Sequence, residues 1–244
     1  MTGAMRWRVL VLLSAVAVAL FAVPAATPDI RVGEPAKPTR GSGPVGRAFR
    51  DCPHCPEMVA VTPGSFVMGA PLPEAITTPF LHRVMFAHRF AYSKDKVSFR
   101  DWKHCVLAGQ CQSLGSTASA SLDPVVQVSW VEAQQYLAWL SLETGTEYRL
   151  LSEAEWEYLA RSSAAVSPGF RFDGLEWTSD CWHADYVGAP RDGSSWERDG
   201  DCRYHVARGR RPGDAAPLVT KRYRFPFDAR DPALGFRVAR TMRD

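Results

Sequence analysis

The sequence predicts an α+β domain with short strands, two or three helices and little regular secondary structure. Two observations predict the helices: Ser129 and Glu132, and again Ser152 and Glu155, have the spacing of a capping box at the start of an apolar run. The third observation is the density of Gly, Asp, Pro and Ser between residues 170 and 218, which predicts that much of the C-terminal half is loop.

The first 25 residues are predicted to be a signal peptide. Arg6 and Arg8 form a basic segment, residues 9–22 are an apolar run, and residues 23–25 are small residues suited to a cleavage site. The apolar run is shorter than the ~20 residues that a membrane span needs; a retained N-terminal anchor is the alternative. We therefore expect a periplasmic or secreted protein with no membrane span after signal cleavage.

Residues 26–50 are predicted to be a flexible linker, because they are rich in Pro and Gly and contain few large apolar side chains. Residues 51–244 are numerous enough for one domain with its own core, and we expect a monomer. The formal net charge of the chain is only +3, so no bulk attraction to nucleic acid is predicted.

The charge is unevenly distributed. Residues 203–244 contain eleven Lys and Arg against four Asp and Glu, a net charge of +7, whereas residues 26–202 have a net charge of −6. A basic end of this kind is suited to an anionic ligand. The alternative is a solvated surface that also pairs with the acidic part of the chain.

Strands are expected at residues 58–61 and 65–68, where Thr62-Pro63-Gly64 has Pro and Gly placed for a type II turn. Strand patterns recur at residues 83–92 and 236–239. These short segments account for the β part of the predicted fold.

Helices are expected at three places. The first covers residues 99–108, with Ser98 as its N-cap and Gly109 after its end. The second starts after Ser129, and the third covers residues 153–161, with large apolar side chains repeating on one face.

The cysteines predict disulfides. An even number of cysteines in an oxidising compartment is typical of a disulfide framework, and this chain has six: Cys52, Cys55, Cys105, Cys111, Cys181 and Cys202. The second pair in the chain flanks the turn after the first helix, so a local bridge is easy. The third pair flanks a Gly- and Asp-rich excursion, and bridging it would close a long loop.

The remaining pair forms the motif Cys52-Pro53-His54-Cys55. The same four letters occur in thioredoxin-like thiol oxidants, in which a helix N-terminus lowers the pKa of the first thiol. Here Pro56 follows at once and a strand comes next, so no helix is available to stabilise a thiolate and a structural disulfide is favoured. Zinc is disfavoured because the other four cysteines contain no second close pair.

The segment from Arg149 to Arg161, RLLSEAEWEYLAR, resembles the Arg-Leu-Pro-Thr-Glu-Ala-Glu-Trp-Glu-Tyr-Ala-Ala-Arg helix of the formylglycine-generating enzyme (sulfatase-modifying factor) family. Five further segments resemble the family in the same order along the chain: residues 58–69, 97–102, 123–130, 176–180 and 234–240. The resemblance covers most of the chain after Asp51. It implies a C-type-lectin-like α+β fold in which two helices pack on a small twisted antiparallel sheet.

The resemblance also shows a departure. Enzymatic members hold copper with a cysteine pair shortly after an Arg-Gly-Gly-Ser-Trp motif, and the oxygen activated there converts a substrate cysteine to formylglycine. Here residues 206–212 read VARGRRP, and no cysteine occurs after Cys202. Because thiolates are the ligands that suit Cu(I), we expect no copper and no formylglycine-forming oxidase chemistry.

Two other groups of residues have the ligand types of metal sites. The resemblance implies structural calcium at Asp173 and Glu176, where family members use carboxylate and backbone oxygens; Glu176 as a hydrogen-bonded loop anchor is the alternative. His183, Asp185 and His205 have the residue types of a 2-His-1-carboxylate site. Their spacing does not require convergence, so surface or loop-stabilising roles are the alternative there.

Arg208, Tyr223, Arg224 and Arg237 match family positions that line the cleft or brace it. Guanidinium groups suit anionic and peptide-carbonyl partners, so these four are candidate substrate-binding residues, with salt bridges to the acidic half as the alternative. Two functions stay open: a divergent oxidase or maturation factor acting on an exported protein or peptide, and a non-catalytic lectin-like module that binds a peptide, glycan or partner protein.

Overall fold

In this computed structural model, a five-stranded sheet with the strand order β1-β2-β5-β11-β6 lies between two hydrophobic cores. Every pairing in the sheet is antiparallel. The strands, in sheet order, are Ala48–Phe49, Met58–Val61, Phe90–Ser93, Val238–Thr241 and Arg149–Leu150. The structure describes residues 48–70, 81–114, 121–162, 170–171, 173–214 and 219–242.

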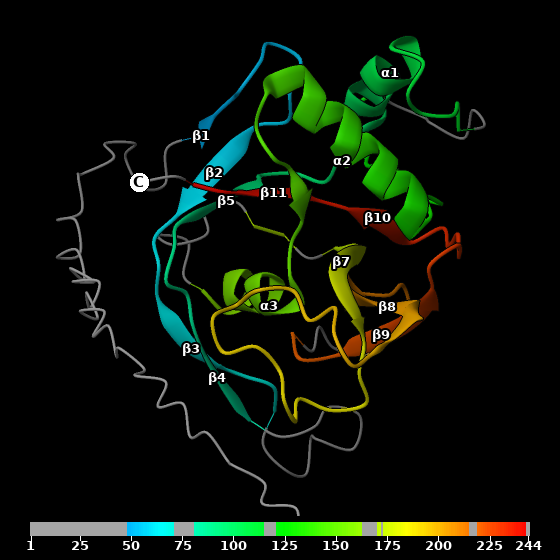
Figure 1. Ribbon diagram of the computed structural model, residues 1–244. Helices are drawn as coiled ribbons and strands as arrows, with labels where there is room; N and C mark the ends of the chain where they lie inside the picture. The colour runs from blue at the N-terminus through cyan, green and yellow to red at the C-terminus, as the bar shows by residue number, and fades with distance from the viewer. Residues whose placement is uncertain are drawn as a thin grey trace, which may run out of the picture. The chain divides into compact units, whose positions relative to one another are not determined.

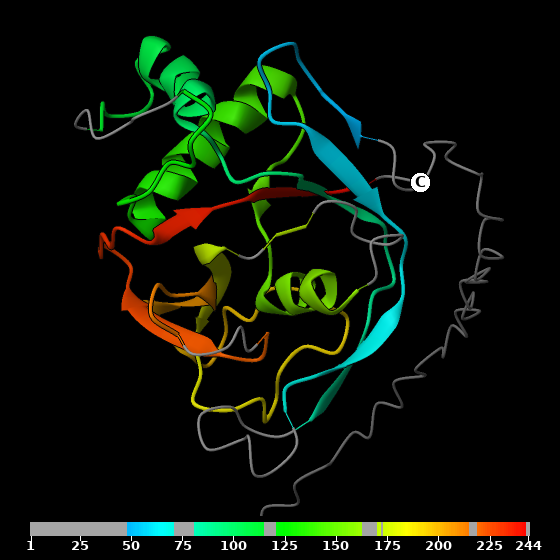
Figure 2. The ribbon, with the colours of Figure 1, turned by 180° about the vertical axis from the view of Figure 1, so that it is seen from behind.

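The inner strands β2, β5 and β11 are buried on both faces, and neighbouring residues along each of them belong to different cores. On β2, Met58 packs with the core of α1 and α2, while Val59 packs with that of α3. The three helices are Phe99–Leu107, Trp130–Thr144 and Glu153–Arg161. Figures 1 and 2 show α1 and α2 on one side of the sheet and α3 on the other.

All three helices begin with a complete capping box. Ser98, Ser129 and Ser152 each accept a hydrogen bond from the backbone N–H three residues later, and the acidic side chain at that position accepts from the serine N–H. The first helix ends at Leu107, one residue before the predicted end, and Gly145 closes α2 in the left-handed conformation with φ 65°. The predicted helices are therefore confirmed.

A second, four-stranded sheet has the order β10-β7-β8-β9. Its pairs are antiparallel except for β10 and β7, which are parallel. The bounds in sheet order are Leu234–Phe236, Gly174–Trp182, Asp201–Arg210 and Arg222–Pro226.

This sheet corrects the prediction of loop between residues 170 and 218, because β7 and β8 are the two longest strands described. β7 lacks the alternation of buried apolar and exposed polar residues that indicates a strand. Thr178, Ser179 and Asp180 are all buried, since their polar groups bond inside the fold. Among the described residues of this segment, 183–200 and 211–214 are free of strand, as predicted.

The expected turn at Thr62-Pro63-Gly64 does not pair its flanking strands. β2 pairs with β1 and β5, whereas β3 (Ser65–Met68) forms a separate two-stranded sheet with β4 (His82–Met85). Gly64 has no left-handed φ, which a type II turn would require at that position. Glycine is needed there for another reason: a Cβ would lie 2.3 Å from the Tyr158 hydroxyl oxygen.

Two predicted strands are each divided in two. The segment 83–92 contains β4 and β5, separated by residues 86–89, and the segment 236–239 is divided at Arg237 between β10 and β11. The backbone at Arg237 thus passes from the four-stranded sheet to the five-stranded sheet. This junction holds the two sheets together through one continuous stretch of chain.

The structure contains the three predicted disulfides: Cys52–Cys55, Cys105–Cys111 and Cys181–Cys202. The folded domain includes Ala48, three residues before the predicted boundary at residue 51, because β1 pairs with β2. The predicted signal peptide and residues 26–47 of the linker lie outside the described residues. Within the described ranges, none of the helices has the length and apolar character for crossing a bilayer.

The disulfides are expected to contribute unequally to stability. The Cys181–Cys202 bridge spans 21 residues and the Cys105–Cys111 bridge spans 6. In the chain-entropy model, removing the longer bridge by a double Ser substitution lowers the free energy of unfolding by about 3 kcal/mol, and removing the shorter one by about 2 kcal/mol. Urea denaturation of the two double variants checks this order, and a larger loss from the shorter bridge would contradict it.

Candidate functional site

The N-terminus of α3 is anchored to two other parts of the chain. The Ser152 hydroxyl accepts the N–H of Glu155 and donates to the carbonyl oxygen of Gly193 at 2.7 Å. The Asp180 carboxylate on β7 accepts the N–H of Glu153 at 2.6 Å. These bonds hold the helix, the strand and the loop after the strand in one arrangement.

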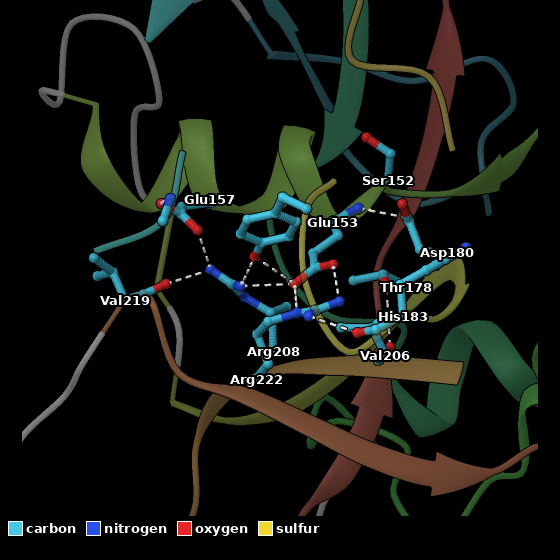
Figure 3. A network of polar contacts seen from close by, with 12 residues as sticks. Ser152, Glu153, Glu157, Thr178, Asp180, His183, Val206, Arg208, Val219 and Arg222 are labelled. Atoms are coloured by element: carbon cyan, nitrogen blue, oxygen red, sulfur yellow. Dashed lines mark hydrogen bonds and ion pairs between the residues drawn. The ribbon is translucent and has the colours of Figure 1, made fainter. Parts of the chain in front are cut away.

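Glu153 lies at the centre of a buried charge cluster (Figure 3). Arg208 donates to its carboxylate at 2.8 Å, and Arg222 donates to both carboxylate oxygens at 2.6 and 3.0 Å. Arg208 also donates to Glu157 at 2.5 Å, and the Tyr186 hydroxyl donates to Glu153 at 3.0 Å. All five side chains are buried, and two guanidiniums balance two carboxylates.

The pKa values of two buried acids of this region, Glu153 and Asp180, are displaced in opposite directions. Burial alone would raise the pKa of Glu153, but the charges of Arg222 and Arg208 outweigh it and lower that pKa below its usual range. Burial, together with the nearby charge of Glu153, raises the pKa of Asp180 to about 7. Hydrogen bonds from two backbone N–H groups oppose this rise.

Asp180 also positions the loop at residues 183–200. Its second carboxylate oxygen accepts the N–H of Trp196 at 2.9 Å. The Trp196 ring stacks on His183 with centroids 3.5 Å apart. The Cys181–Cys202 disulfide closes the base of this loop, so the loop is held at its base and along its length.

A cleft of about 720 Å³ lies between this loop and the β4–β5 connection. We call it the loop cleft. It is lined by residues 86–90, Arg149, Glu155, Gly188, Pro190, residues 192–199 and Thr241. Its volume is in the range of small-molecule pockets.

One wall of the loop cleft depends on a glycine. Gly193 has φ 81°, and a Cβ there would lie 2.1 Å from a carbon of the Phe86 ring. Only glycine therefore lets the loop approach the opposite wall so closely. The exposed rim residues Glu197, Arg198 and Asp199 follow on the same loop.

The lining of the loop cleft carries charges of both signs: Arg89, Arg149 and Arg198 against Glu155, Asp192, Glu197 and Asp199. Arg149 and Glu155 form a two-bond pair at 2.6 and 2.7 Å within it. The cleft thus offers both donors and acceptors to a polar ligand, beside the aromatic side chains of Phe90 and Trp196.

The four predicted substrate-binding residues fall into two groups, and none lines the loop cleft. Arg208 and Arg237 are 0 % and 3 % exposed and make internal ion pairs, which supports the bracing interpretation for both. Arg224 lies on β9 with 45 % of its side chain exposed, over the ring of Tyr204. Tyr223 is half-buried, and its hydroxyl donates to a carboxylate on the neighbouring turn.

The residues predicted to hold calcium already have protein partners. The Glu176 carboxylate accepts from Arg237 at 3.0 and 3.2 Å and from the indole N–H of Trp156 at 3.2 Å. The Asp173 carboxylate is exposed and pairs with Arg171 at 3.1 Å. These contacts favour the alternative interpretation, in which Glu176 is a hydrogen-bonded anchor for the start of β7.

The 2-His-1-carboxylate residues do not face one another. His183 places both ring nitrogens against backbone carbonyl oxygens, His205 places Nδ1 against another, and Asp185 accepts the N–H of Val187. Within the described ranges, no three His, Cys, Asp or Glu side chains are grouped as metal ligands. The loop-stabilising alternative therefore describes His183 best.

The donor set does not fit thiolate-bound copper. All six cysteines of the chain are in disulfides, so no thiolate is present for Cu(I).

Sequence reasoning missed Glu153, Asp180, Trp196 and Arg222. One signal was available for the first, because Glu153 and Glu157 are four residues apart and therefore share a face of α3. A pair of acids on a helix that packs into a core indicates buried basic partners. No local signal marks Arg222, which lies 69 residues from Glu153.

The comparisons with known proteins agree with this fold. The model described as "Sulfatase-modifying factor enzyme 1-like domain" matches residues 45–171. Among solved structures, PvdO from Pseudomonas aeruginosa is 31 % identical with a TM-score of 0.70, and the match covers 82 % of this chain and all of that one. The chain therefore belongs to the sulfatase-modifying factor enzyme 1-like domain family.

Two more distant structures share the fold alone. Treponema denticola variable protein 1 is 16 % identical with a TM-score of 0.60, over 82 % of this chain and all of that one. CarF is 14 % identical with a TM-score of 0.54, over 78 % of this chain and all of that one. No match is found among curated protein sequences.

Arg208 and Arg224 are expected to differ strongly in their effect on stability. The substitution Arg208→Met removes two fully buried ion pairs and leaves Glu157 with Arg161, and Glu153 with Arg222, as the remaining arginine partner. This should lower the free energy of unfolding by about 3 kcal/mol. Arg224→Met is the matched control, because its exposed pair with Asp201 at 3.7 Å is worth about 0–1 kcal/mol. Urea unfolding followed by tryptophan fluorescence compares them, and equal losses would refute the buried role of Arg208.

Asp180 is expected to make stability depend on pH. Its pKa is about 7 in the folded protein and near 4 when unfolded, so the folded state binds more protons between these values. The contribution is fully present below pH 4 and is lost as the pH rises through 7. The stability advantage of the wild type over Asp180→Asn should therefore be smaller at pH 8 than at pH 4.5. Denaturation at both pH values tests this, and a constant difference would contradict it.

Proposed function

We propose that this chain is an exported sulfatase-modifying-factor-like protein that binds a peptide segment of an exported protein or peptide in the loop cleft. The observation that carries the proposal is the cleft itself, which is large, open and lined by charges of both signs. A peptide presents N–H donors and carbonyl acceptors at every residue. A cleft with mixed donors and acceptors meets that need better than a surface of one charge.

The rigidity of the loop wall supports binding. Asp180 holds the N–H of Trp196, Ser152 holds the carbonyl oxygen of Gly193, and the Cys181–Cys202 disulfide closes the base. A wall that is already in place before the ligand arrives costs little ordering entropy on binding.

Export is supported by two features. The N-terminal segment has the pattern of a signal peptide. All six cysteines are paired, which is typical of proteins that fold in an oxidising compartment. Together they favour a periplasmic or secreted protein.

Selection from a displayed library of random peptides on the purified disulfide-bonded chain tests the proposal. We expect enriched sequences with charges of both signs. Arg198→Glu should weaken binding of a selected peptide by at least about fivefold, about 1 kcal/mol, because this exposed arginine lines the cleft.

Arg210→Glu is the matched control. Arg210 is also an exposed arginine, at the end of β8, but it does not line the loop cleft. An unchanged affinity for this variant is expected. Equal weakening by both reversals, or no enriched peptide at all, would show that the loop cleft is not the binding site.

The same selected peptides separate the two functions that the sequence left open. Mass spectrometry after incubation with the protein and air reports whether the bound peptide is altered. A changed mass identifies a maturation factor, and an unchanged mass with retained binding identifies a binding module.

A further inference from the structure

Lys96 is a buried lysine in the connection between β5 and α1. Only 9 % of it is exposed, and its ammonium donates to the backbone carbonyl oxygen of Asp173. A lysine is rarely buried without a partner that needs its charge. Lys96 is therefore expected to have a structural role that needs its charge.

The chain leaves room for this ammonium at the start of β7. Gly174 has φ 77°, and a Cβ there would lie 2.7 Å from Lys96 Nζ and 3.1 Å from the carbonyl oxygen of Ala233. Any side chain at position 174 would therefore collide with the ammonium or with the backbone. The neighbouring carbonyl of Ala233 accepts the N–H of Leu175 at 2.8 Å.

The surroundings of Lys96 contain groups that oppose its positive charge and groups that favour it. Burial lowers the pKa of Lys96, the carboxylate of Glu176 raises it, the guanidinium of Arg237 lowers it and Asp173 raises it. Two acids are thus close enough to act on the ammonium, and one of them, Glu176, is 1 % exposed.

Both residues that the family resemblance assigns to calcium, Asp173 and Glu176, are in contact with cations of the protein itself. Lys96 bonds the carbonyl oxygen of Asp173, Arg171 pairs with the carboxylate of Asp173, and Arg237 pairs with Glu176. Calcium takes six to eight oxygen ligands. To collect them at this place, it would have to displace three positive side chains that also repel it.

We propose that the ammonium of Lys96 is a built-in cation that takes the place of calcium at the start of β7. It links the connection before α1 to β7, beside the parallel pairing of β7 with β10. The junction between the two sheets is then held by side chains of the chain, with no metal required.

The first test compares the folded wild-type chain in calcium and in chelator. Its Tm should be the same in 5 mM CaCl₂ and in 5 mM EDTA within about 1 °C, because no ligand set is open. Titration calorimetry with CaCl₂ should show no saturable binding. A stoichiometric binding heat, or a Tm lowered by EDTA, would overturn the proposal.

The second test removes the charge and keeps the length of the side chain. Lys96→Met should lower the Tm by roughly 5 °C, the scale of one lost buried charged hydrogen bond in a domain of this size. Lys103→Met, at an exposed position of α1, is the matched control and should leave the Tm unchanged. A Lys96→Met protein as stable as the wild type would mean that the site needs no cation, which also overturns the proposal.

If Lys96→Met does not fold, the calcium and chelator measurements on the wild type still decide. Neither test uses the loop cleft, so a failure here leaves peptide binding untouched, and the reverse also holds.

Discussion

The fold depends on the ion pairs that Glu153 makes with Arg208 and Arg222. Both arginines belong to the four-stranded sheet, and Glu153 begins the helix on the opposite side of the cluster. Buried ion pairs add little net stability when complete, but they are costly to leave half-made. Their effect is therefore to permit one placement of α3 on β8 and β9 and to penalise the alternatives. Asp180 accepts a hydrogen bond from the same helix terminus and another from Trp196. It therefore fixes the loop that forms one wall of the cleft relative to α3.

The helices could be predicted from sequence because their signals are local. The strands were harder to predict because they depend on long-range contacts. A capping box such as Ser152 with Glu155 needs only three residues of spacing, so its meaning survives in any context. The strand β7 lacks the usual alternation because Thr178 and Asp180 are buried polar residues whose partners come from distant parts of the chain. The strand break at Arg237 also has no local sequence signal, because it arises from long-range pairing. The residues before it pair with β7, and the residues after it pair with β5.

The candidate site was less predictable than the fold for the same physical reason. The residues named from resemblance were arginines and acids, and sequence cannot tell an arginine that faces a ligand from one that faces a glutamate 51 residues away, as Arg208 faces Glu157. The loop cleft is formed by residues 192–199 and by the β4–β5 connection, two irregular segments with no motif in common. Only the disulfide between Cys181 and Cys202 indicated in advance that this loop is held in place.

The position of β11 has a consequence for the order of events during synthesis. This strand lies at the C-terminal end of the described chain, yet it is an inner strand of the five-stranded sheet, between β5 and β6. Until it is made, both neighbours have unpaired edges, and neither core can close. Folding therefore cannot finish while the ribosome is still adding residues before Val238. The five-stranded sheet therefore stays divided into separate parts through almost all of the chain's translation.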